Sequence, residues 1–190
     1  MSKNSESRIY GKREFIKIMS KATYSIVKYR KCMKLINKEF QTNLMLSVTE
    51  VNGCRVCSYY HTKRAIDSGI SNQELQSLLT GNHKNVKVEE AQALLFAQHY
   101  ASEKGNYSKV TFQKIIEHYG KEEAYGILAN TTLISFGNAY GINLGNLKSR
   151  FTKIGRVKDS KIINELFICF SPIMLMPITL FINLFRKKQY

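Results

Sequence analysis

Residues 11–40 read GKREFIKIMSKATYSIVKYRKCMKLINKEF, and the spacing of their apolar side chains decides the fold class. The apolar positions recur mostly at intervals of three and four residues, which places them on one face of a helix. These positions are Phe15, Ile18, Met19, Ala22, Ile26, Tyr29, Met33, Ile36 and Phe40. The stretch therefore predicts an amphipathic helix, or a bent pair of helices, with one buried side.

The same spacing returns at residues 91–98, 112–119 and 124–134. A further apolar segment, residues 44–51, is predicted to be helical and to stop at the Asn52-Gly53 dipeptide. No segment alternates apolar and polar residues between hairpin turns, so we predict an all-α fold.

Local signals set further helix boundaries. A helix is predicted at residues 54–68, where Gly69 offers a left-handed stop, and a capping box at 71–74 begins the next one. Three glycines four residues apart are expected to allow close helix packing or to mark a helix end. They are Gly137, Gly141 and Gly145.

Length and charge limit the class of protein. The 190 residues suit one helical domain at 1–150, which begins with a loose polar arm at 1–9. A basic linker and an apolar segment are predicted at 151–190. The net charge of +15 favours nucleic acid, anionic lipid or acidic partners. No zinc-finger spacing or nucleic-acid fold signature accompanies that charge, so we do not expect a nucleic-acid partner. Residues 1–14 do not resemble a signal peptide, and a cytoplasmic location is predicted.

Two of the four cysteines, Cys54 and Cys57, form a close pair, and His61 follows one helical turn later. On a helix these three residues share a face. In a reducing cytoplasm such a pair indicates redox activity or metal binding, not a disulfide that stabilises the fold. Cys32 and Cys169 stand alone and are expected to be small apolar residues of the core.

The pair and the histidine can complete a two-electron cycle. A helix start at Cys54 and the nearby Arg55 would favour a thiolate, and His61 could exchange the proton. One thiolate would attack a peroxide or a disulfide, and the other would resolve the intermediate as an intramolecular disulfide. The helix start favours Cys54 as the attacking thiol, whereas the nearby His61 favours Cys57.

Other interpretations remain open. A structural zinc site needs four ligands, and the pair with His61 offers three; His83, His99 and His118 have no spacing that selects a fourth. The cysteines could also be packing residues, or the chain a non-catalytic redox sensor. A thioredoxin-like fold would need strands around the pair, and none is predicted. We predict no organic or metal cofactor.

The stretch from Val51 through Asn52-Gly53-Cys54, Cys57 and His61-Thr62, followed by Ala65 and Gly69-Ile70-Ser71, resembles the carboxymuconolactone decarboxylase and alkylhydroperoxidase AhpD-like family. The resemblance covers about residues 40–145. It implies an all-helical homo-oligomer that reduces hydroperoxides or partner disulfides, with electrons from a thiol reductant that the sequence does not identify. Retention of both cysteines favours this redox branch over lactone decarboxylation.

The resemblance also implies site residues. Cys54 and Cys57 would be the redox pair and His61 the proton-relay histidine, with Arg55 and Glu50 as possible support. The family pattern has a glutamate about three turns before the first cysteine, a place held here by Thr42. Glu39 and Glu50 are nearby carboxylates at other spacings, and Val56 stands where AhpD has a second histidine. Disulfide reduction or redox sensing would demand less proton transfer than peroxidase turnover.

Residues 166–185 read LFICFSPIMLMPITLFINLF and are long enough to cross a bilayer. Pro172 and Pro177 are expected to kink the segment, and basic residues flank it on both sides. Six precede it (Lys148, Arg150, Lys153, Arg156, Lys158 and Lys161) and three follow (Arg186, Lys187 and Lys188). This pattern predicts association with a membrane through residues 166–188, with the domain in the cytoplasm, or packing in an oligomer interface.

Overall fold

A computed structural model describes residues 8–54, 73, 87–152 and 157–188. Within these ranges the chain is all-α and contains no strand, which confirms the predicted fold class. The helices are α1 (Lys12–Met33), α2 (Lys38–Asn52), α5 (Val88–Ser102), α6 (Lys109–Tyr119), α7 (Lys121–Ser149) and α8 (Ile162–Phe185). The predicted helix at 54–68 and the capping box at 71–74 lie outside the described residues, apart from Cys54 and the exposed Gln73.

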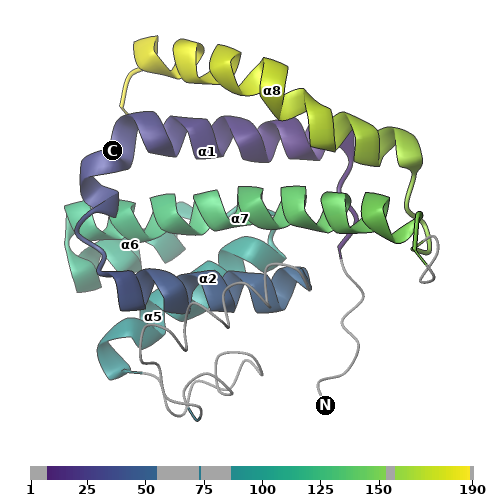
Figure 1. Cartoon of the computed structure of the whole chain (residues 1–190). Coiled ribbons are helices and arrows are strands. Elements are labelled where there is room, and N and C mark those ends of the chain that lie inside the picture. Colours follow the sequence, from purple (N-terminus) through teal and green to yellow (C-terminus); the bar gives the residue numbers. More distant parts are fainter. Residues whose placement is uncertain (1–7, 55–72, 74–86, 153–156, 189–190) are drawn as a thin grey trace.

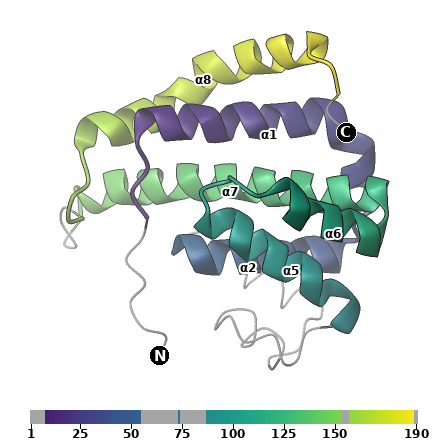
Figure 2. The same cartoon turned by 180° about the vertical axis from the view of Figure 1, so that it is seen from behind.

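The helices stack in layers around α7. In Figures 1 and 2, α8 lies on α1, α1 lies on α7, and α2 with α5 covers the opposite side of α7. α7 packs against each of the other five described helices, whereas α8 contacts α1 and α7. One buried cluster joins α2, α5, α6 and α7 to the end of α1, and a second lies between the first half of α1, α7 and α8.

Polar caps and glycines set the helix ends. The predicted helical stretch at 11–40 divides at residues 34–37, because the Asn37 side chain accepts a hydrogen bond from the Phe40 amide and begins α2. α1 is also kinked at Tyr29, where φ is −119° and ψ is 16°. α2 ends at Gly53 in the left-handed conformation, with φ of 66°, as the Asn52-Gly53 dipeptide predicts.

α1 and α7 approach each other closely at Gly126. A Cβ atom at this position would lie 2.4 Å from the backbone oxygen of Cys32. The predicted close packing is wrong for Gly137, which is exposed and has no atom within 4 Å of an added Cβ. At Gly137 the repetitive glycine spacing therefore did not mark a tight contact, whereas Gly126, outside that repeat, faces a neighbouring backbone.

We expect Gly126→Ala to destabilise the protein and Gly137→Ala to stabilise it slightly. The first adds a methyl group where the α1 backbone must shift, at a cost of about 1–3 kcal/mol. The second removes only the helix penalty of glycine, a gain of about 0.5–1 kcal/mol. Urea unfolding followed by circular dichroism measures both. Equal effects of the two substitutions would contradict the packing at Gly126.

Candidate active site at the end of α2

The end of α2 places Cys54. The Gly53 amide donates to the carbonyl oxygens of Thr49 and Glu50 at 3.0 and 3.3 Å, which ends the helix one residue before the cysteine. Cys54 itself has no regular secondary structure. Its exposed fraction is only 1 %, and it packs in the second buried cluster. The other buried members are Tyr10, Phe15, Ile18, Met19, Ala139, Ile142 and Ile168.

Cys54 is disulfide-bonded, whereas Cys32 and Cys169 are free and buried. The two free cysteines fill apolar space as predicted, and burial together with the nearby Glu165 raises the pKa of Cys169. Cys57, His61 and Arg55 lie outside the described residues. Within the described part, no group of three or more His, Cys, Asp or Glu side chains could hold a metal ion.

Arg8 ties the N-terminal segment to this end of α2. Its backbone amide donates to the Asn52 carbonyl oxygen at 3.3 Å, and its guanidinium donates to the Ala101 carbonyl oxygen at 3.2 Å. The guanidinium also forms an ion pair with Glu14. Arg8 was assigned from sequence to a loose arm, but these contacts fix it beside the cysteine-bearing turn.

Buried amides lie close to Cys54 in the chain and in space. Thr49 donates to Asn138 Oδ1 at 3.2 Å, between α2 and α7, and Asn138 precedes a residue of the Cys54 cluster. The Nδ2 atoms of Asn52 and Asn138 are buried and have no hydrogen-bond partner in the described part of the chain. Cys54 therefore packs among apolar side chains, and the adjoining last residue of α2 carries a buried amide donor, Asn52 Nδ2.

Neither Thr42 nor Glu39 is a suitable relay group. Thr42 is fully buried, and its hydroxyl donates to the Lys38 carbonyl oxygen at 2.8 Å, a bond within its own helix. Glu39 is half-buried and pairs with Lys87 at 2.6 Å. Glu50 is half-buried in the last turn of α2.

A different carboxylate is buried beside α2. Glu90, in the first turn of α5, is 5 % exposed, and its Oε2 accepts a hydrogen bond of 2.7 Å from Asn43 Nδ2. Asn43 follows Thr42, the place of the family glutamate. Sequence analysis missed Glu90, because an acidic residue in a first helical turn is ordinarily a solvated partner of the helix dipole.

A cavity in the described part is separate from Cys54, which does not line it. It has a volume of about 500 Å³ and lies between α1, α6 and α7, beside the end of α8. Five tyrosines line it: Tyr24, Tyr29, Tyr100, Tyr107 and Tyr125. Lys21, Lys109 and Arg186 add positive charge, and burial, followed by the nearby Lys17, lowers the pKa of Lys21. A cavity with aromatic walls and cationic groups suits an anion that has an apolar body. No sequence motif predicted this cavity.

Comparison with known protein-family models, curated proteins and solved structures yields no match. The AhpD-like resemblance therefore rests on the cysteine motif and its surroundings.

The tyrosine cavity leads to a prediction about pH. Burial raises the pKa of Tyr107 to about 12 from 10.0, so folding favours its neutral phenol. Its contribution to stability is complete below pH 10.0 and declines as the pH rises from there toward 12. The difference in absorbance at 295 nm between wild type and Tyr107→Phe, measured on folded protein, should titrate near the upper value. A midpoint near the ordinary tyrosine value would contradict the burial of Tyr107.

Proposed function

We propose that this protein is a thiol-dependent oxidoreductase that reduces hydroperoxides or partner disulfides through Cys54 and Cys57. The observation that carries the proposal is the disulfide at Cys54, the first residue of the C-x-x-C motif, in a chain whose Cys32 and Cys169 are free. His61 would exchange protons with the pair, with Arg55 beside it. The AhpD-like resemblance supports this activity and a homo-oligomeric assembly.

The reaction balances without a cofactor. One thiolate attacks the hydroperoxide, the O–O bond breaks, and the alcohol leaves after protonation while the cysteine becomes a sulfenic acid. The second thiol then displaces water and forms the disulfide. An external thiol reductant supplies the two electrons and two protons that restore both cysteines.

We infer that Cys57 attacks and Cys54 resolves. At 1 % exposure Cys54 is closed to a bulky substrate, and its apolar neighbours hold it in place. A resolving thiol needs to reach only its partner cysteine, whereas the attacking thiol must meet substrate.

We further propose that Glu90 replaces the missing family glutamate in the proton relay. It is a buried carboxylate at α2, and its Asn43 partner adjoins Thr42. Glu39 does not suit this role because its carboxylate is already paired with Lys87.

We place the activity in the cytoplasm. The described chain contains one helix, α8, that is long and apolar enough to cross a membrane. That observation supports membrane association of the enzyme.

The activity is tested on protein that has first been reduced with dithiothreitol. Free thiols are counted before and after addition of one equivalent of hydroperoxide. Wild type should lose two thiols and form a Cys54–Cys57 disulfide. Cys54→Ser should trap a sulfenic acid on Cys57, which dimedone labels, and Cys57→Ser should leave Cys54 unreacted. The double variant Cys32→Ser, Cys169→Ser is the matched control and should behave as wild type. Unreactive thiols in wild type would overturn the proposal, and zinc analysis of the same sample would follow.

The relay is tested by Glu90→Gln. The amide can keep a hydrogen bond with Asn43 but cannot ionise, so the rate of thiol loss should fall by about 10²-fold or more. Its pH profile should also lose one ionisation. Glu39→Gln, which alters a carboxylate paired with Lys87, should keep the wild-type rate and profile. A wild-type pH profile in Glu90→Gln would contradict the relay.

A further inference from the structure

α8 has an inverted polarity. Three of its five buried residues are polar (Glu165, Ser171 and Asn183), whereas large apolar side chains face outward. The outward residues form a continuous stripe at steps of three and four residues along the helix. Its members are Ile163, Leu166, Phe170, Met174, Ile178, Phe181 and Phe185, each between 41 % and 75 % exposed.

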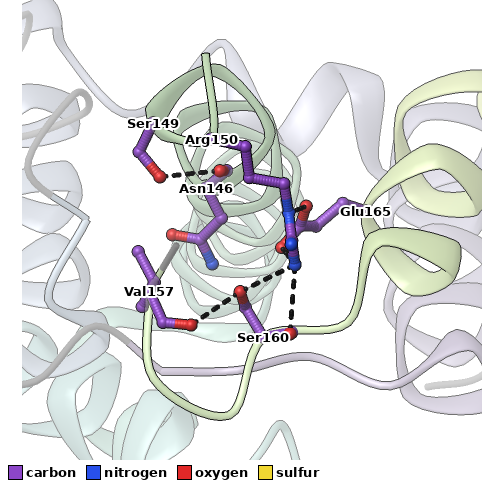
Figure 3. Close-up of polar contacts among 6 residues, drawn as sticks. All are labelled: Asn146, Ser149, Arg150, Val157, Ser160 and Glu165. Carbon is purple, nitrogen blue, oxygen red and sulfur yellow. Dashed lines mark hydrogen bonds and ion pairs between the residues drawn. The ribbon is translucent and has the colours of Figure 1, made fainter. Parts of the chain in front are cut away.

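Polar contacts hold the inner side of α8 to the protein. At its start, Arg150 donates to both carboxylate oxygens of Glu165, at 2.5 and 3.0 Å, and to Ser160, as Figure 3 shows. Towards its end, Asn183 Nδ2 donates to Thr23 Oγ1 at 3.0 Å. Lys28 Nζ donates to the Leu184 carbonyl oxygen at 3.1 Å, where a cation complements the C-terminal end of the helix dipole.

These contacts keep α8 lengthwise on α1 (Figure 1). α8 is one continuous helix through Pro172 and Pro177. If α8 crossed a bilayer in this arrangement, α1 would enter the hydrocarbon with it. Along its whole length α1 carries eight charged residues: Lys12, Arg13, Glu14, Lys17, Lys21, Lys28, Arg30 and Lys31. Each basic residue at the centre of a membrane costs about 2.5–3.5 kcal/mol. The packed structure therefore favours a helix that lies on the membrane.

The basic residues at both ends of the stripe favour lipids with anionic headgroups. Exposed Lys158 and Lys161 precede α8, and exposed Arg186 and Lys187 follow it, in a chain with a net charge of +15. Basic groups at the border of an apolar helix face attract anionic headgroups. A second copy packed on this stripe would bring basic ends against basic ends in either orientation, so self-association through this stripe is disfavoured.

We infer that α8 is an in-plane membrane anchor, whose apolar stripe enters the boundary between headgroups and acyl chains of an anionic membrane. Anchoring is independent of the cysteine chemistry. The polar residues on its inner side then serve to keep the helix parallel to the surface while its apolar side meets lipid.

Vesicle cosedimentation of the full chain tests the anchor. Wild type should bind phosphatidylcholine vesicles containing about 30 % phosphatidylserine at least 10-fold more tightly than pure phosphatidylcholine, and high salt should weaken this binding. Met174→Glu with Phe181→Glu should reduce binding at least 10-fold, because both side chains belong to the stripe. Leu95→Glu with Val110→Glu is the matched control: these residues are 54 % and 70 % exposed on other helices, and the charge change is the same.

Insertion depth separates an in-plane helix from a spanning one. The chain has no tryptophan, so single Phe170→Trp, Phe181→Trp and Phe185→Trp variants each report one position. Quenching by lipids brominated at known depths should place all three at the same shallow level. Depths that change steadily along α8 would overturn the in-plane arrangement.

Three further results would contradict the anchor. They are absence of wild-type binding, equal binding by the stripe and control variants, and a wild-type dimer in light scattering that only the stripe variant dissociates. The thiol count with hydroperoxide on the stripe variant should equal that of wild type. Failure of the lipid test and failure of the thiol chemistry are thus separate results.

Discussion

The close approach of α1 and α7 at Gly126 is the constraint on which the other contacts depend. There the Cys32 backbone oxygen occupies the space that a side chain would need. This contact lets α7 lie in the middle of the molecule, packed against every other described helix. α1 in turn supports α8 from the other side, and α2 holds the cysteine-bearing turn against α7. A wider separation of α1 and α7 would disturb both the candidate active site and the outer helix.

The surroundings of Cys54 suit the resolving role that we propose for it. The left-handed Gly53 stops α2 and turns the chain, and the next residue enters an apolar cluster. Because that cluster leaves Cys54 only 1 % exposed, the proposed resolving thiol is shielded from solvent. Buried carboxylate and amide groups approach α2 from α5 and α7. The chemistry that we propose therefore depends on groups far apart in the sequence.

The two sides of α8 face different environments, the protein on one side and the outer surface on the other. Two of its buried polar side chains, Asn183 and Glu165, find partners in Thr23 of α1 and in Arg150 at the end of α7, which relieves the cost of burying them. Its apolar side chains are left outside, where water is an unfavourable neighbour and lipid a favourable one. The large excess of basic residues adds long-range attraction to an anionic surface.

The sequence by itself determined the helical class, because apolar periodicity is a local property that α1, α5, α6 and α7 display directly. It also determined the end of α2 at Asn52-Gly53 and the long apolar helix near the C-terminus, since glycine conformation and helix length depend on few neighbours. The motif nominated Cys54, Cys57 and His61. Tertiary structure decided that Gly126 makes the tight contact, where the sequence had drawn attention to Gly137. It also buried Cys54, brought Glu90 to Asn43, and turned the polar side of α8 inward. Those outcomes depend on which helix faces are brought together, and sequence periodicity specifies a face without specifying its partner.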